Sequence, residues 1–94
     1  MPKLTWGRDL YVITCGEITK LGRSQHPQKR LQEVARGMPW SPCRLWAVFP
    51  DAGFLEAGLH RQLSGQFERR GEWYKASPDV IVQLAVAQLA AVET

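Results

Sequence analysis

The stretch "DLYVITCGEITKLG", residues 9–22, constrains the fold more than any other part of this 94-residue chain. Two β-rich runs, 10–15 and 18–22, flank Gly16-Glu17, which suits a two-residue hairpin turn with glycine first. Directly opposed residues share a face of a sheet, so Tyr11 would stand beside Gly22, a position without a side chain. Both faces are apolar: one carries Tyr11, Ile13, Cys15 and Ile18, the other Leu10, Val12 and Leu21. This pattern predicts a sheet with helices on both sides.

The rest of the chain alternates between helical and extended patterns. Pro27 suits the first turn of a helix and Gly37 the position after its end, and Leu31, Val34 and Ala35 form its apolar stripe. A third strand is expected over 43–49, with Cys43, Leu45, Ala47 and Phe49 on one side. Asp51 is expected to cap a helix over roughly 52–66 with Ala52, Leu55, Leu59 and Leu63 as its core stripe, and Ser77-Pro78 begins the last helix. Residues 69–77 are interpreted as a turn with a short extended piece. The predicted fold class is α+β: a small three-stranded, mostly antiparallel sheet flanked by about three helices.

Length and composition narrow the class of protein. Residues 1–94 are expected to form one domain, since 45% hydrophobic and 22% charged residues are typical of globular chains. Cys15 and Cys43 are too few for a disulfide scaffold, so both are predicted to be reduced core residues, and a structural zinc site is not expected. The first ten residues lack the apolar core of a signal peptide, and the apolar run 80–92 is too short for a membrane span. A cytoplasmic protein without membrane contact is therefore expected.

A net charge of +3 favours polyanionic partners. The stretch "ITKLGRSQHPQKRLQE", residues 18–33, concentrates that charge where a strand gives way to a helix. A helix N-terminus is a favourable place for an anion, and an arginine can hold a phosphate through two hydrogen bonds. Gly22 would leave room there, Ser24 offers a hydroxyl, and Lys29 and Arg30 supply charge. The alternative is an ordinary solvated turn.

Glu56 is the first candidate for metal chemistry, because a carboxylate on the inward side of a helix is costly to bury unless it is paired or binds a cation. His60 follows one helical turn later on the same face. The two could form only a structural pair. Alternatively, Glu56 could hold Mg²⁺ together with waters and a substrate phosphate.

Tyr11 is a candidate general base only if nearby cations lower its pKa by roughly 3 units from about 10. The basic residues are spread over several elements and could meet a nucleic-acid backbone, while Trp40, Trp46 and Trp73 could stack on bases or fill the core. The residues expected to contact DNA are Lys20, Arg23, Ser24, Lys29, Arg36, Arg69 and Arg70.

Five short motifs, in this order and spacing, resemble the GIY-YIG nuclease superfamily, most closely its phage-type branch. They are "LYVI" at 10–13, "KLG" at 20–22, Arg30, "LEAGLH" at 55–60 and "FERRGEWYK" at 67–75. The resemblance implies a phosphodiesterase that acts on DNA with Mg²⁺ or Mn²⁺. By the same resemblance, Glu56 would hold the metal, Arg30 would orient water and the scissile phosphate, Tyr11 would be one of two active-site tyrosines, and Arg23 would replace the cation after the second motif.

Some positions depart from the family pattern. Asp9 stands at the glycine of the first motif, Lys20 at the second tyrosine, and Val34 where a His or Tyr usually follows the arginine. His60 could take over one of the lost roles, since imidazole titrates in a useful range. Three hypotheses therefore stay open. The first is an endonuclease that uses Tyr11, Arg30, Glu56 and His60; the second is a DNA-binding module that has lost hydrolysis; the third is an assembly role, with a homodimer formed through residues 80–92.

Overall fold

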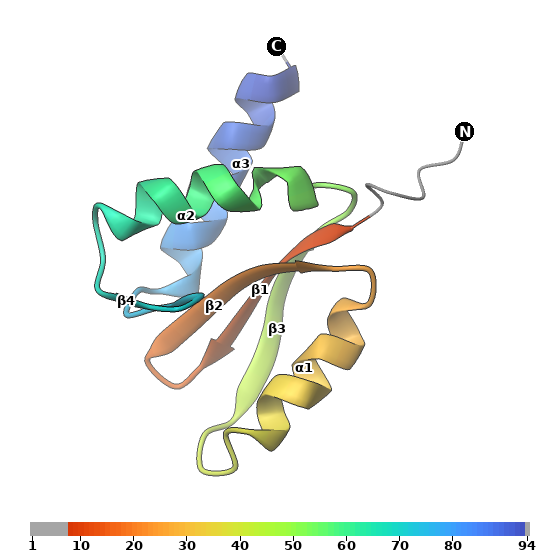
Figure 1. Ribbon diagram of the computed structural model, residues 1–94, viewed down its shortest axis with the longest axis vertical. Coiled ribbons are helices and arrows are strands. Elements are labelled where there is room, and N and C mark those ends of the chain that lie inside the picture. The colour runs from red at the N-terminus through yellow and green to blue at the C-terminus, as the bar shows by residue number, and fades with distance from the viewer. Residues whose placement is uncertain (1–7, 94) are drawn as a thin grey trace.

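The computed structural model describes residues 8–93 and shows an α+β fold with three α-helices and an antiparallel sheet of five strands (Figure 1). The predicted fold class is thus confirmed, with two short strands more than expected. The elements are β1 (Asp9–Cys15), β2 (Ile18–Ser24), α1 (Pro27–Arg36), β3 (Cys43–Phe49), the 3-10 helix η1 (Gly53–Leu55), α2 (Glu56–Ser64), β4 (Arg69–Arg70), β5 (Trp73–Tyr74) and α3 (Pro78–Glu93). The strand order is β3-β1-β2-β5-β4. Residues 1–7, on which part of the signal-peptide prediction rests, lie outside the described residues.

The β1–β2 hairpin has the predicted register. Tyr11 pairs with Gly22, Ile13 with Lys20 and Cys15 with Ile18, and Gly16 has a φ of 62°, which suits glycine in the turn. One face of the hairpin packs with α1 and the other with α2 and α3. The two apolar faces therefore predicted helices on both sides correctly.

Strand β3 corrects one prediction, because its inward residues do not share a face. The β1–β3 register shifts between Val12, opposite Ala47, and Ile13, opposite Leu45, which leaves Trp46 as an extra residue. Such a bulge reverses the alternation of the side chains that follow it. Cys43 and Leu45 consequently pack on the α1 side, whereas Ala47 and Phe49 pack on the α2–α3 side.

The prediction of two reduced cysteines is wrong in this structure. Cys15 and Cys43 are opposed residues of β1 and β3 and form a disulfide bond. Composition argued against a disulfide scaffold, but it does not exclude a single bond between strands that the fold makes neighbours.

Two helical predictions also need correction. Ala35 is exposed and no residue of α1 is fully buried, so the helix lies against the sheet mainly through Leu31 and Val34. The second helix is divided into η1 and α2, and their N-cap positions are Ala52 and Leu55. Asp51 instead lies in the preceding turn with a φ of 59°, where its N–H donates to Oδ1 of Asp9 at 2.9 Å.

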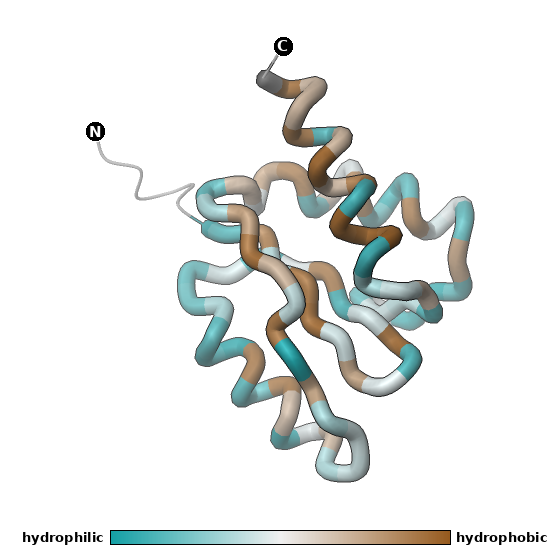
Figure 2. Tube along the Cα trace, turned by 180° about the vertical axis from the view of Figure 1, so that it is seen from behind, coloured by the Kyte–Doolittle hydropathy of each residue, from teal (hydrophilic) through white to brown (hydrophobic). Residues whose placement is uncertain are grey.

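The stripe Ala52, Leu55, Leu59 and Leu63 is buried as predicted, against the α2–α3 face of the sheet. Ser77 precedes α3 as predicted, and its Oγ accepts a hydrogen bond from the Asp79 N–H at 3.1 Å. The helix extends beyond the sheet, with hydrophobic residues along it (Figure 2). Within residues 8–93, the helices are all too short or too polar to cross a membrane.

Candidate functional site

Helix α2 places Glu56 and His60 one turn apart and points both toward the sheet. Oε2 of Glu56 lies 3.5 Å from Nε2 of His60, and their side chains are only 14% and 11% exposed. The predicted Glu–His pair is therefore present, and it is more deeply buried than an ordinary surface pair.

Glu72 completes a cluster that the sequence interpretation missed. It lies between β4 and β5, where Gly71 turns the chain with a φ of 61°, and it comes near α2 because β5 pairs with β2. One potential ligand atom from each of Glu56, His60 and Glu72 can be chosen so that all three lie within 4.8 Å of one another. The signal was present in the motif "GEWYK" at 71–75, but only the pairing with β2 shows where its carboxylate lies.

The hydrogen bonds of His60 leave one ring nitrogen directed at the cluster. Nδ1 shares a hydrogen bond with the Tyr74 hydroxyl, which also lies 3.3 Å from the carbonyl oxygen of His60. If that hydroxyl donates to the carbonyl, Nδ1–H donates to the tyrosine oxygen and Nε2 carries a lone pair. Nε2 is buried and has no hydrogen-bond partner in the described part of the chain. A histidine whose other nitrogen is fixed in this way is typical of metal ligands.

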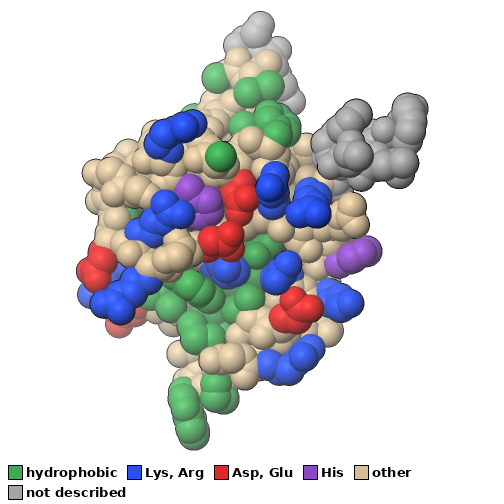
Figure 3. Space-filling model, viewed as in Figure 1, with side chains coloured by type: hydrophobic (Ala, Val, Ile, Leu, Met, Phe, Trp, Pro, Cys, Tyr) green, Lys and Arg blue, Asp and Glu red, His purple; other side chains and the backbone are tan. Residues whose placement is uncertain are grey.

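Two cations neutralise the carboxylates. Nε of Arg23 lies 3.2 Å from Oε1 of Glu56, and Nζ of Lys20 lies 2.7 Å from Oε1 of Glu72. Gly53 helps to position Arg23, because a Cβ on Gly53 would come within 3.2 Å of the Cβ of Arg23 and 2.9 Å of the Arg8 carbonyl. Figure 3 shows the result: acidic and histidine side chains meet near the middle of one face, with Lys and Arg side chains around them.

The local environment shifts the pKa values of Glu56 and Glu72 in opposite directions. Burial and the charge of Glu72 raise the pKa of Glu56, although Arg23 opposes them. Burial also resists ionisation of Glu72, but the hydrogen bond and charge of Lys20 outweigh it and lower the pKa of Glu72. Burial and the nearby Arg69 lower the pKa of His60, against the opposing effects of Glu72 and the Leu21 carbonyl. A neutral imidazole and an ionised Glu72 are both suited to metal binding.

Tyr11 connects this cluster with α1. Its ring is 2% exposed, and burial together with the charge of Glu72 raises its pKa to about 12, although Arg30 acts in the opposite direction. The condition under which Tyr11 could act as a general base, a pKa lowered by roughly 3 units, is therefore not met, and Tyr11 keeps its proton at neutral pH. The charges of Glu56 and Arg30 both act on Tyr11, and Glu56 pairs with His60.

Gly22 has a different role from the one expected. A Cβ on Gly22 would lie only 2.5 Å from Cζ of Tyr11, so the space above the glycine is filled by the phenol ring. The small residue leaves room for Tyr11 itself, and not for a phosphate or a water molecule.

The start of α1 forms a polar hollow beside this region. It has a volume of about 190 Å³ and is lined by Ser24, His26, Lys29, Arg30 and Glu33. Oγ of Ser24 accepts a hydrogen bond from the His26 N–H at 2.9 Å, and its own proton can still be donated. Nη1 of Arg30 lies 3.4 Å from Oε1 of Glu33, and the arginine side chain is half-exposed.

The other predicted DNA contacts are more scattered. Nη1 of Arg69 donates to Oγ of Ser64 at 2.7 Å, and Arg69 is close enough to His60 to affect its pKa. Arg70 is exposed on the edge strand β4. Arg36 ends α1, about 9 Å along the helix from Arg30 at 1.5 Å per residue, and is not part of the cluster.

The donor set fits a divalent metal ion. Carboxylate oxygens suit Mg²⁺ and Mn²⁺, and the imidazole favours a first-row transition metal such as Mn²⁺ over Mg²⁺. The unpartnered Nε2 of His60 supports this assignment.

Comparison with known proteins gives one match. Residues 10–88 match the T5orf172 domain, a family related to the GIY-YIG nucleases. No curated protein and no solved structure matches the chain. The superfamily relationship is thus confirmed, while the phage-type branch stays a prediction.

Proposed function

Because the chain belongs to the T5orf172 domain family, we propose that it binds DNA and hydrolyses phosphodiester bonds with a divalent metal ion, Mg²⁺ or Mn²⁺. The observation that supports this most is the meeting of Glu56, His60 and Glu72, whose ligand atoms lie within 4.8 Å of one another, with the charges of both glutamates and of Arg30 acting on Tyr11. Two carboxylates and an imidazole whose Nε2 has no hydrogen-bond partner among the described residues can form a metal-binding set, and the arginine adds a group that can hold a phosphate.

Each residue has a distinct role in this proposal. Glu56, His60 and Glu72 would hold the ion, and a bound ion would supply positive charge to neutralise a phosphate oxygen and to favour attack by water. Arg30 contacts the scissile phosphate and stabilises the charge that develops on it. Tyr11, protonated because of its raised pKa, donates a hydrogen bond and does not act as a base at neutral pH.

A plasmid-nicking assay with Mg²⁺ or Mn²⁺ tests the proposal. Glu56→Gln removes a ligand without changing the shape of the side chain, and we expect nicking to fall by at least about 10–100-fold. Arg30→Ala is expected to lower it by about 100-fold. The matched control is Glu17→Gln, an exposed glutamate of the hairpin turn, which should nick like wild type. Equally poor nicking by wild type and Glu56→Gln would contradict the enzyme proposal.

A second candidate function is DNA binding without hydrolysis. It is favoured by Lys20, whose Nζ lies 2.7 Å from Oε1 of Glu72 and neutralises that carboxylate. By the resemblance to the GIY-YIG nucleases, this lysine stands at the position of the second active-site tyrosine. This alternative predicts salt-sensitive DNA binding that survives Glu56→Gln and weakens in Arg30→Ala. Fluorescence anisotropy with labelled duplex DNA at several salt concentrations measures both effects, and equal affinity of the two variants would count against it.

A further inference from the structure

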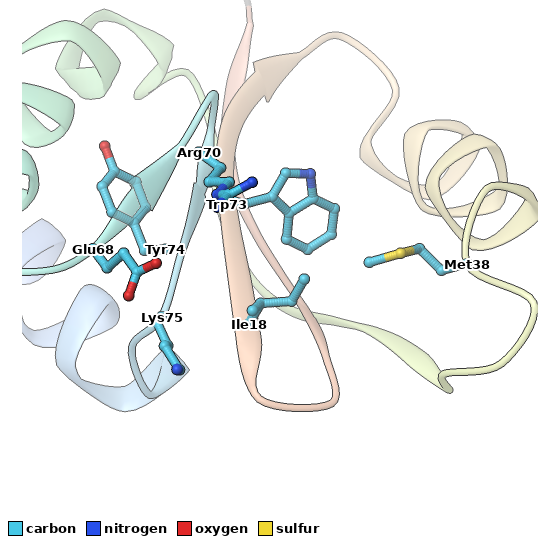
Figure 4. Close-up of a pocket in the computed structure, with 7 residues that line it drawn as sticks. All are labelled: Ile18, Met38, Glu68, Arg70, Trp73, Tyr74 and Lys75. Atoms are coloured by element: carbon cyan, nitrogen blue, oxygen red, sulfur yellow. The ribbon is translucent and has the colours of Figure 1, made fainter.

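A pocket of about 280 Å³ lies next to the candidate metal site. Its lining residues are Ile18, Met38, Glu68, Arg70, Trp73, Tyr74 and Lys75. Figure 4 shows the Trp73 ring nearly face-on, with Ile18 below it and Met38 extending toward it from the end of α1. The volume is slightly below the usual range of drug-sized ligand pockets, about 300–1,000 Å³, and suits one flat ring system.

The strand register explains the mixed chemistry of this pocket. Trp73 lies opposite Lys20 on β2 and opposite Arg70 on β4, so all three side chains share the α1 face of the sheet. Lys75 follows β5 in a bend and also lines the pocket, whereas Tyr74 points to the face opposite Trp73 and is buried in the core there. The aromatic and aliphatic surface is bordered by three exposed charged residues, the cations Arg70 and Lys75 and the anion Glu68.

The pocket is joined to the candidate metal site by one side chain. Nζ of Lys20 lies 5.6 Å from the centre of the Trp73 ring and 2.7 Å from Oε1 of Glu72. Glu72 and Trp73 are also consecutive residues, and they contribute to the cluster and to the pocket respectively. A ligand in the pocket would therefore lie beside a phosphate bound at the cluster.

We propose that this pocket binds one unpaired nucleobase of the DNA substrate, stacked on Trp73, with an adjacent phosphate contacted by Arg70 and Lys75. The inference rests on the proposed function, because it assumes that DNA is the partner. Aromatic platforms beside cations are the usual means of holding single-stranded nucleic acid, and a paired base cannot reach such a pocket without leaving its stack. The substrate class is thus DNA with an unpaired nucleotide near the scissile bond.

The test measures binding without cleavage. Duplex DNA with one bulged 2-aminopurine is compared in EDTA with the same duplex carrying an abasic site at the bulge. We expect wild type to quench the 2-aminopurine fluorescence and to bind the base-containing duplex at least about fivefold more tightly, the lower end of what stacking of one base supplies. Trp73→Leu should abolish both effects, while Trp73→Phe should retain part of them.

Trp46→Leu is the matched control, since Trp46 is a half-exposed tryptophan of β3 and does not line this pocket. It should behave like wild type. If wild type binds DNA but does not distinguish the base from the abasic site, or if Trp73→Leu distinguishes them equally well, the pocket assignment is wrong and the proposed function stands. If wild type does not bind DNA, both fail. Circular dichroism of each variant shows whether it folds, and Arg70→Ala, which changes only an exposed side chain, should weaken binding of both duplexes.

Discussion

The two faces of the central sheet are built in different ways. On the face covered by α2 and α3, eleven buried residues form one cluster that extends from Leu10 of β1 to Ala85 of α3. On the face covered by α1, three buried residues, Tyr11, Ile13 and Cys15, are surrounded by side chains that are only partly buried. The first face has more of the buried contacts that stabilise the fold, and the second carries the aromatic and charged groups that we propose to contact DNA.

The candidate metal site lies where these faces meet. His60 is fixed by Tyr74 from the well-packed face, whereas Tyr11 belongs to the face under α1. A candidate metal ligand held by a hydrogen bond and a more open surface under α1 are thereby combined on one sheet. The comparison of the two faces shows that the residues of the main core and the residues proposed to bind DNA can lie on opposite sides of one sheet.

The largest expected effect is a core truncation on the well-packed face. Leu59→Ala, at a position with 0% exposure, should lower the free energy of unfolding by about 2–5 kcal/mol, because it removes buried contacts and leaves a cavity. Leu31→Ala on α1, where the leucine is only partly buried, should cost about 1 kcal/mol. Urea denaturation measures both, and equal losses would show that the two faces do not differ in stability.

Removal of the disulfide tests how the α1 face is held together. The bond joins residues separated by 28 positions, and the double variant Cys15→Ala/Cys43→Ala should lose about 3 kcal/mol through greater freedom of the unfolded chain. Wild type in the presence of a thiol reductant should lose a similar amount. An unfolding midpoint that is unaffected by reductant would show that the bond does not contribute.

A smaller effect concerns pH and His60, which faces Glu56, Glu72, Lys20, Arg69 and Tyr74. Burial lowers its pKa in the folded state, so the unfolded chain binds more protons as the pH falls through about 6.5, its ordinary value. The free energy of unfolding should therefore decrease on acidification through this region, by at most about 1.4 kcal/mol per pH unit for one proton.

The measurement is urea denaturation in EDTA across this pH range. His60→Gln should remove this part of the pH dependence, whereas His26→Gln, at the exposed start of α1, should keep it. The same slope in wild type and His60→Gln would contradict the assignment.

The smallest change in stability is expected on the outer side of α3. Val86 is 51% exposed, and the third hypothesis from the sequence is a homodimer formed through residues 80–92. Val86→Glu should alter the stability of a monomer by no more than about 0.5 kcal/mol, but it should dissociate a dimer. Light scattering distinguishes these states, with Gln83→Glu on the same helix as control, and a monomer in both wild type and Val86→Glu would remove the dimer hypothesis.

The sequence was sufficient where local chemistry determines geometry. The Gly16-Glu17 turn sets the register of β1 and β2, and the spacing of Leu55, Leu59 and Leu63 identifies the buried side of α2. The same spacing placed Glu56 and His60 on one face, which the structure confirms.

The sequence was insufficient where the geometry depends on pairing between strands that are distant in the chain. Strands β4 and β5 have two residues each and depend on pairing with β2, so Glu72 could not be placed beside Glu56 from the sequence. The bulge at Trp46 and the disulfide between Cys15 and Cys43 also depend on how β3 meets β1, which no local pattern encodes.

The contact between Gly22 and Tyr11 makes the two positions a single unit for mutation and selection. Any side chain at position 22 would meet the phenol ring at 2.5 Å, and the ring, at 2% exposure, has little space in which to move. A library that varies the two positions independently would discard substitutions at 22 that a smaller residue at 11 could accommodate. Directed evolution of this chain should therefore randomise both codons together.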